Sequence, residues 1–373
     1  MKKVGIITFH NSYNCGSMLE TYAMQESVKK LGYKPEIVDY SSDGQLSMYS
    51  VFFKNNNLKN IVKNLLILPH CLKIKKNNKK YISFKDKYFS LTKKEYRDND
   101  IISDKDYLAV IAGSDQIWNI TIPDYSDNYF LNWVNGDKKK IAYAPSFGSK
   151  NPVKYSSNST YYGNMIKKFD CLSTRENNGK KWIKDLTGRD ASVVLDPTLL
   201  LETEDYNKIV ADDLKVKGKY IFFYCPSFNS DICKFVKKLS KKYKLPVIAW
   251  SSKNYYIFSV WKYGFKLAEY ENPKSYLYYI KNAELVLTTS FHGTIFSTIF
   301  KKKFFTIKNG DMYGDDDRVL TLVKELGIED RLIPFDFNDD FDYLKDVNYK
   351  NYDKNLVRLR KESYDYLSDS LKD

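Results

Sequence analysis

The chain has 373 residues, of which 43% are hydrophobic, and this length predicts two domains with separate cores. A net charge of +14 favours anionic partners, but no nucleic-acid-binding module or arginine-rich stripe is present, so no nucleic-acid partner is expected. Five scattered cysteines and three isolated histidines argue against a disulfide framework and a structural metal. No segment has enough consecutive apolar residues to span a bilayer, and we expect a cytoplasmic protein.

The N-terminal half alternates predicted strands and helices. A strand over residues 2–10 ends in an Asn/Gly-containing loop, a helix follows over 18–32, and a second strand covers 35–40. This β-α-β order predicts a parallel sheet. Residues from about 45 to 100 are rich in lysine and asparagine, and their helical pattern indicates an insertion. Further strands that run into polar loops are predicted within 107–119, 139–148, 170–176 and 191–200.

A second α/β series begins near Lys217. Strands are predicted over 219–226, 245–250, 284–290 and 302–307, and the helices between them over 230–243, 272–283 and 291–300. We therefore expect an N-terminal domain over 1–205 that carries the insertion, and a C-terminal domain over 206–340. A helix within 341–373 is expected to pack back on the body. The predicted architecture is two Rossmann-like parallel-sheet domains with a cleft between them.

Polar, glycine-containing loops follow most of these strands, and ligands of parallel sheets bind at the strands' carboxyl ends. In the segment TTSFHG, Ser290, His292 and Gly293 lie at the N-terminus of the helix predicted over 291–300. The free N–H groups and the dipole of a helix N-terminus favour an anion, and a histidine there can act as a general acid or base. The alternative is a capped helix end whose histidine bonds nearby backbone.

Arg175 follows a predicted strand in the same way, and its planar guanidinium suits a carboxylate or phosphate. The alternative for this arginine is a structural ion pair with Glu176 or Asp196. Arg318 opens a predicted helix after an acidic loop, where a solvated charge is the default interpretation. His10 is placed near the cleft, whereas His70 in the basic insertion is expected to have no special role.

The remaining candidates for substrate binding come from two loops. The first loop is a candidate phosphate nest, but it lacks both the G-x-G-x-x-G pattern and a Walker lysine. In the second loop, Asp115 is either a base or a helix cap. The candidates in these loops are Asn14, Gly16, Ser17, Ser114, Asp115 and Gln116.

These segments together resemble the polysaccharide pyruvyl transferase family. The resemblance rests on TFHNSYNCGSMLETYAMQ, AGSDQIWN, YAPSFG, STREN with LDPTLL, TTSFHGTIFS and the closing DRVLTLVKELGIEDR. It runs in order from about residue 3 to about residue 335. One departure is the first loop, NCGSMLE, where many members have Gly-Asn-x-Gly-Asp. This variant resembles a subgroup whose acceptors are the least predictable.

The resemblance implies a GT-B-like arrangement of the two domains and a reaction in the cleft. The pyruvyl group of phosphoenolpyruvate would be placed on two hydroxyls of a sugar in a surface polysaccharide or its precursor, as a cyclic ketal. His292 matches the family's Ser-x-His-Gly histidine, and Arg175 matches the arginine of its Ser-x-Arg-Glu/Asp motif. Ser290, Gly293, Thr294 and Arg318 join the loop residues above as candidate substrate-binding residues. No redox cofactor and no metal are expected.

Two other functions remain open at this point. The first is a GT-B-type glycosyltransferase that uses a nucleotide sugar, and the second is a non-catalytic scaffold of polysaccharide assembly. The saccharide acceptor is either free or linked to a lipid diphosphate. Because the chain is basic and rich in tyrosine, peripheral contact with an anionic inner membrane face is an expectation too, and residues 45–100 are the expected acceptor-facing or membrane-facing element.

Overall fold

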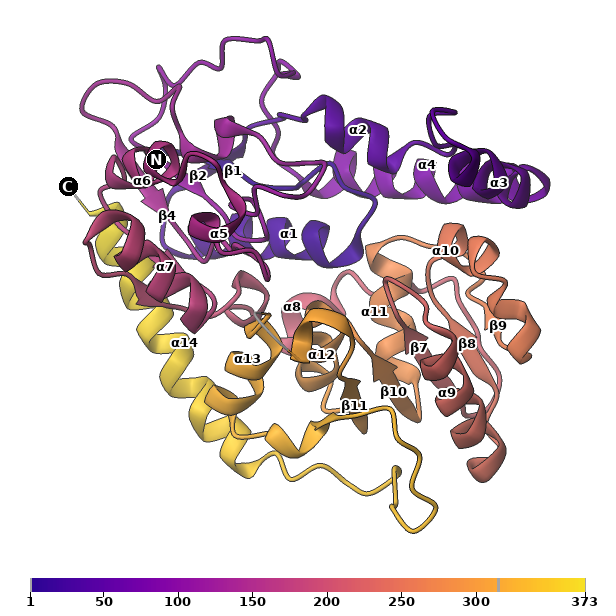
Figure 1. The fold of residues 1–373 in the computed structure, drawn as a ribbon. Coiled ribbons are helices and arrows are strands. Elements are labelled where there is room, and N and C mark those ends of the chain that lie inside the picture. The colour runs from indigo at the N-terminus through magenta and orange to yellow at the C-terminus, as the bar shows by residue number, and fades with distance from the viewer. Residues whose placement is uncertain (1, 314–315, 373) are drawn as a thin grey trace.

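The structure is a computed structural model that describes residues 2–313 and 316–372 (Figure 1). Short apolar runs form its strands, and each main sheet is parallel. The N-terminal sheet has the order β2-β1-β3-β4. Its strands are β1 (Lys3–Ile7), β2 (Lys34–Ile37), β3 (Ala109–Ala112) and β4 (Lys139–Ala142). The central strand β3 is buried along its whole length, as parallel strands covered on both faces are.

The predicted β-α-β opening is confirmed, because α1 (Cys15–Lys30) connects β1 to its parallel neighbour β2. Gly32 follows this helix with a positive φ of 86°, a conformation that glycine adopts at little cost. A small sheet of β5 (Ser173–Thr174) and β6 (Ser192–Val193) continues beyond β4, to which a bridge between Ile141 and Cys171 connects it. The helices of this region are α5 (Pro152–Tyr155), α6 (Ser159–Lys167), α7 (Asn177–Thr187) and α8 (Thr203–Asn207).

The C-terminal sheet has the order β12-β11-β10-β7-β8-β9. Its strands are β7 (Ile221–Tyr224), β8 (Val247–Ala249), β9 (Lys266–Leu267), β10 (Leu285–Thr288), β11 (Phe304–Ile307) and β12 (Leu332–Ile333). The associated helices are α9 (Ser230–Tyr243), α10 (Ser252–Ile257), α11 (Pro273–Asn282), α12 (Phe291–Ile299) and α13 (Arg318–Leu326). The sequence did not predict α10 and β9, which are short and lack a clear period. The fold class, α/β with parallel sheets, is confirmed.

The lysine-rich insertion contains α2 (Asp43–Tyr49), α3 (Leu58–Ile67) and α4 (Cys71–Tyr88), and Figure 1 shows it projecting from the N-terminal half. The helical prediction is wrong from residue 89 onward, where bridges from Ile37 to Leu91 and from Tyr40 to Tyr96 extend the edge of the sheet. The insertion also contacts the C-terminal half, because Glu271 donates its backbone N–H to the Asn77 side chain at 3.1 Å. It therefore connects the two halves at one end.

The last helix, α14 (Lys350–Leu371), runs along both halves (Figure 1). It packs beside α13, and its Tyr366 hydroxyl donates to the carbonyl of Ala142 in β4 at 2.8 Å. Ser363 accepts from the backbone N–H of Leu195 at 2.9 Å. The predicted domain bounds stay a prediction. None of the helices in the described part of the chain is long and apolar enough to cross a bilayer.

Candidate active site

A polar cavity of about 470 Å³ lies where loops from both main sheets meet. The N-terminal half contributes residues that follow β1, β3 and β5, and the C-terminal half contributes the loop between β10 and α12 and the start of α13. The cavity thus lies at the carboxyl ends of parallel strands, as the sequence predicted. The predicted residues that line it are Asn14, Asp115, Gln116, Arg175, Ser290, His292 and Arg318.

Three helices begin at this cavity. Asn14 caps α1 by accepting from the backbone N–H of Gly16 at 2.9 Å, and Ser290 caps α12 by accepting from that of Gly293 at 3.3 Å. Arg318 is the first residue of α13. The free N–H groups and the positive dipole ends of all three helices favour negative charge in the cavity.

His292 lies in the first turn of α12 and is buried against α1. A Cβ atom at Gly16 would lie 2.3 Å from His292 Nδ1, so α1 can approach the imidazole this closely only with glycine at that position. On the other side, His292 Nε2 lies 3.4 Å from the Asp196 carboxylate. Asp196 can therefore orient the imidazole, as carboxylates do in other acid–base sites. The sequence indicated Asp196 only as a candidate ion-pair partner of Arg175.

The Arg175 guanidinium is fully enclosed, and it combines the two roles that the sequence left open. It donates to Asp196 at 3.0 Å and to Asp115 at 3.4 Å, so the structural ion pair is present. It also lines the cavity and lies over the Phe291 ring, 4.5 Å from the ring centre. Arg175 therefore connects the loops after β3, β5 and β6 at the wall of the cavity.

Burial by itself raises the pKa of Asp196, but His292 and Arg175 reverse this effect and hold that pKa below its usual range. The pKa of Asp115 is lowered as well, because Arg175 and His292 outweigh its burial. In contrast, burial raises the pKa of Glu176 to about 7 despite Arg175 and Arg318. The two aspartates are thus ionised near neutral pH and hold the Arg175 guanidinium and the His292 imidazole in place.

Asp115 is also bonded to its own loop and to α1. It accepts from the Ser17 hydroxyl at 2.5 Å and from the backbone N–H of Gln116 at 2.8 Å. With its lowered pKa, this carboxylate resembles a cap and a positioning group more than a base. Ser17 therefore contributes by holding Asp115, although Ser17 itself does not line the cavity.

The default interpretation of Arg318 as a solvated charge is wrong. Its side chain is only 16% exposed and donates from two nitrogens to the Asp316 carboxylate, at 2.8 Å and 2.5 Å. This bidentate pair holds the guanidinium at the wall of the cavity. Arg318 thus lies opposite the N-terminal loops as a second arginine of the site.

Several predicted residues lie behind the cavity rather than in its wall. Ser114 donates its backbone N–H to Glu20 and its hydroxyl to Ala144, both at 2.7 Å. Thr294 donates to the carbonyl of Ser290 at 3.0 Å. Gly293 and Gly16 allow close packing, against Thr288 and His292 respectively.

The two other histidines lie outside the polar cavity. His10 is buried, and its Nε2 lies 2.8 Å from Asp39, so it does not line the cavity as the sequence suggested. His70 stacks on the Tyr256 ring with 3.5 Å between the ring centres, which makes it a contact between the insertion and α10.

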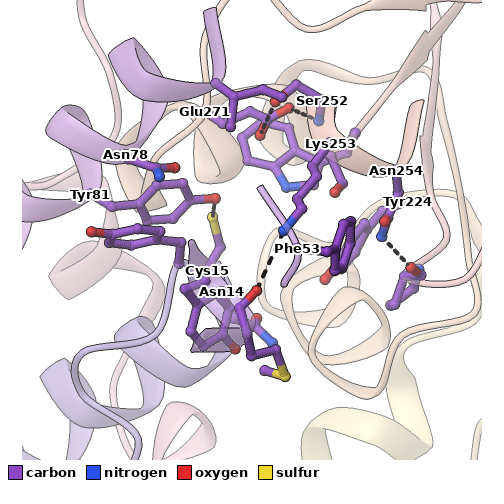
Figure 2. A pocket seen from close by; sticks show the side chains of 17 residues that line it. Asn14, Cys15, Phe53, Asn78, Tyr81, Tyr224, Ser252, Lys253, Asn254 and Glu271 are labelled. Atoms are coloured by element: carbon purple, nitrogen blue, oxygen red, sulfur yellow. Dashed lines mark hydrogen bonds between the residues drawn. The ribbon is translucent and has the colours of Figure 1, made fainter. Parts of the chain in front are cut away.

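A second cavity, of about 420 Å³, adjoins the first and is rich in aromatic side chains (Figure 2). Asn14, Tyr224 and Pro226 line both cavities. The other lining residues come from α1, the insertion and the C-terminal half, and they include Tyr13, Tyr49, Phe53, Asn78, Tyr81, Trp250, Lys253, Asn254 and Glu271. The sequence did not predict this cavity, because its residues come from segments that are distant in sequence.

Two titratable groups of the aromatic cavity have pKa values far from their ordinary ones. Burial raises the pKa of Glu271 to about 7, although Ser252 donates both its N–H and its hydroxyl to it. Burial and the nearby Lys63 lower the pKa of Lys253 to about 8. Lys253 donates to the carbonyl of Ser50 at 2.8 Å and lies 4.0 Å from the centre of the Phe53 ring.

Within residues 2–313 and 316–372, no group of three His, Cys, Asp or Glu side chains could hold a metal ion.

The fold and the position of the polar cavity define a two-sheet α/β protein of the GT-B type. A UDP-N-acetylglucosamine 2-epimerase from Rickettsia bellii superposes with a TM-score of 0.51 at 12% identity, over 98% of each chain. A second UDP-N-acetylglucosamine 2-epimerase gives 0.50 at 11% identity, over 97% of this chain and 95% of the other. These similarities show the fold alone.

The sequence identifies the family of the chain, which the fold alone does not. The sequence model of the polysaccharide pyruvyl transferase family matches residues 14–311, and the chain belongs to this family. No curated protein matches the chain significantly. The matched range includes Asn14, Asp115, Arg175, Asp196 and His292, but it ends before Arg318.

Proposed function

We propose that this protein transfers the pyruvyl group of phosphoenolpyruvate to two hydroxyls of a saccharide and forms a cyclic ketal. The observation that carries the proposal is the polar cavity, which Arg175, Arg318 and His292 line and at which three helices begin. Phosphoenolpyruvate carries a phosphate and a carboxylate, and both need such donors. The membership in the pyruvyl transferase family supports the reaction type.

The reaction needs two additions at one carbon. An acceptor hydroxyl adds to C2 of the enol phosphate while C3 gains a proton and the hydroxyl gives up its own. Phosphate then leaves as the bond between C2 and its bridging oxygen breaks. The second hydroxyl adds to C2, loses its proton and closes the ketal. No electrons are exchanged with an external partner, so no redox cofactor is required.

The residues of the polar cavity suit these steps. Arg318 and the helix N-termini bind the anionic groups of the donor, and Arg175 adds positive charge to the wall. His292, oriented by Asp196, either protonates C3 or assists the departure of phosphate. Charge that develops on phosphate during its departure is stabilised by donors that are already fixed in place, which lowers the barrier.

The aromatic cavity is the proposed acceptor site. Aromatic side chains provide large apolar faces, which suit the C–H faces of a sugar, and the polar side chains among them can fix its hydroxyls. Because Asn14 and Tyr224 line both cavities, a saccharide bound here would lie next to the donor. Figure 2 shows Tyr81 and Asn78 on one side of this cavity and Lys253 and Asn254 on the other.

Replacing Arg318 with methionine is expected to weaken the binding of phosphoenolpyruvate by about 10- to 100-fold, which corresponds to the loss of a charge-assisted hydrogen bond. Arg318→Lys keeps the charge and should lose less. Isothermal titration calorimetry measures both constants, and Arg358→Met, at an exposed arginine of α14, is the matched control. Unchanged affinity in Arg318→Met would contradict the donor site.

Replacing Phe53 with alanine is expected to raise the KM for the saccharide about tenfold and to leave the KM for phosphoenolpyruvate nearly unchanged, because Phe53 lines the aromatic cavity but not the polar cavity. The local fold should persist, since the Phe53 backbone is held by the Asn64 side chain through two hydrogen bonds of 2.9 Å. Phe258→Ala, at a half-exposed phenylalanine outside both cavities, is the control. Equal changes in the two KM values would argue against separate sites.

A glycosyltransferase that uses a nucleotide sugar is the second candidate, because the GT-B fold is shared with nucleotide-sugar enzymes. This function predicts binding of a nucleoside diphosphate in the polar cavity and no response to phosphoenolpyruvate. The calorimetric titration distinguishes the two candidates when UDP and GDP are included as ligands.

A further inference from the structure

The helix α3 presents its apolar face outward. Leu58, Ile61, Val62 and Leu65 have the spacing i, i+3, i+4 and i+7, so they share one face, and they are between 40% and 77% exposed. The apolar face of an amphipathic helix in a globular protein normally faces the core. Here the helix packs on α10 with other residues, and the last residue of the helix, Ile67, is buried.

The exposed apolar surface continues beyond α3. Leu66, Leu68 and Leu72, at the connection to α4, are also exposed, as is Ile82 further along α4. These residues and the apolar face of α3 are named the α3 surface here. It lies on the part of the insertion that projects furthest in Figure 1, beside α4. An exposed apolar patch of this kind indicates an interaction site.

The charge of the insertion identifies the kind of partner. Between Asp43 and Asp86 the sequence has nine lysines and no aspartate or glutamate. Five of these lysines are exposed, namely Lys54, Lys59, Lys75, Lys76 and Lys79. Exposed aliphatic residues flanked by lysine, without any carboxylate, are the pattern of helices that lie in the interface of an anionic bilayer.

We propose that the α3 surface docks on an anionic lipid bilayer. The exposed leucines, isoleucines and valine enter the boundary between headgroups and acyl chains, and the lysines contact the acidic headgroups. A second copy of the chain fits this surface less well. Two such surfaces facing each other would bring their lysines together, and the segment offers no carboxylate to neutralise them.

Docking would also orient the proposed acceptor site. The same insertion provides Met48, Tyr49, Phe53, Ile74 and Tyr81 as one wall of the aromatic cavity. A bilayer against α3 therefore lies beside this wall. In the extension that rests on the proposed function, the acceptor is a saccharide carried on a lipid diphosphate, which reaches the cavity from the membrane surface.

The experiment is co-sedimentation of the full chain with vesicles of phosphatidylcholine, with and without phosphatidylglycerol. The wild type is expected to sediment with the anionic vesicles only. Leu58→Gln/Leu65→Gln should reduce its partition coefficient by about tenfold or more, because these two are the most exposed large apolar side chains of the helix. Lys75→Gln/Lys76→Gln/Lys79→Gln should reduce it by about fivefold per lysine removed, and added salt should have a similar effect.

Matched controls make the same kind of change elsewhere. Ile101→Gln and Val357→Gln replace exposed aliphatic residues outside the insertion and should bind as the wild type does. Equal sedimentation with neutral vesicles, no sedimentation, or an unchanged Leu58→Gln/Leu65→Gln variant would overturn the proposal. A dimer in light scattering that this variant dissociates would also overturn it, in favour of a second copy.

The vesicle experiment contains no phosphoenolpyruvate, so its outcome is independent of the proposed reaction. If the wild type sediments with anionic vesicles but does not bind phosphoenolpyruvate, the docking proposal stands and the proposed function is wrong. If the wild type binds phosphoenolpyruvate but not vesicles, the proposed function stands and the docking proposal is wrong.

Discussion

Replacing His292 with alanine is expected to lower kcat by about 10²–10⁴-fold, the usual range for the loss of an acid–base group. The imidazole lies at the start of α12 and lines the polar cavity, and its Nε2 lies 3.4 Å from the Asp196 carboxylate. The measurement is the release of phosphate from phosphoenolpyruvate in the presence of a saccharide acceptor. The KM for the donor should change much less than kcat, because the effect is expected in the transition state.

Gly16 provides a test of the position of this imidazole. Gly16→Ala should displace the ring, since the new Cβ would lie 2.3 Å from Nδ1, and kcat should fall while the fold is retained. In the double variant with His292→Ala, Gly16→Ala should have little further effect, because the two changes act on one group. A near-normal kcat in His292→Ala would contradict the assignment of this histidine.

Replacing Arg175 with methionine is expected to lower the free energy of unfolding by about 3–5 kcal/mol, the cost of removing one partner from a buried charge pair. The guanidinium donates to Asp196 and Asp115 and lies 3.8 Å from the Glu176 carboxylate. Without it, these three buried carboxyl groups would lack their central cation. Urea unfolding followed by fluorescence measures the loss.

The loss of stability in Arg175→Met should increase with pH. In the wild type the folded-state pKa values of Asp115 and Asp196 are lowered, so their stabilisation is present above the unfolded pKa of about 4 and is lost as the pH falls further. In Arg175→Met, Asp115 loses the charge that most opposes the effect of its burial, so its folded-state pKa rises and it contributes less stability as the pH rises, whereas His292 still lowers the pKa of Asp196. The difference between the two proteins should therefore be larger at pH 8 than at pH 5.

Two controls separate this effect from a general loss of charge. Arg358→Met removes an exposed arginine of α14 and should change stability by less than about 0.5 kcal/mol. Asp115→Asn combined with Arg175→Met should restore part of the stability, because Arg175 is the strongest influence that lowers the pKa of Asp115 and the double variant removes the carboxylate that has lost it. Stability within error of the wild type in Arg175→Met would contradict the ion-pair network.

Local patterns in the sequence were sufficient for much of the fold and for part of the site. The segment from Leu285 to Gly293 predicted a strand, a polar loop and a helix start, and β10, the Ser290 cap and α12 follow that order. Such features depend on hydrogen bonds between residues a few positions apart. The short elements α10 and β9 were missed, because their length is set by packing against neighbours and not by a periodic pattern.

The sequence could not show which predicted residues meet one another. Asp196 contacts both His292 and Arg175, but the three residues are separated by 21 positions or more along the chain, and only the arrangement of the two halves brings them together. The aromatic cavity was missed for the same reason, since Phe53, Tyr81 and Trp250 belong to three distant segments. Ser114 shows the opposite case. It lies in a polar loop after a strand, but its donors are used by neighbours inside the protein.

The most direct test of the central claim is a thermal-shift titration of the wild type with phosphoenolpyruvate, UDP and GDP. A ligand that binds the native state raises the unfolding midpoint by an amount that grows with its concentration. The proposed function predicts a rise with phosphoenolpyruvate and none with either nucleotide. A rise with a nucleoside diphosphate alone would contradict it in favour of sugar transfer, and no response to any of the three ligands would contradict it in favour of a scaffold.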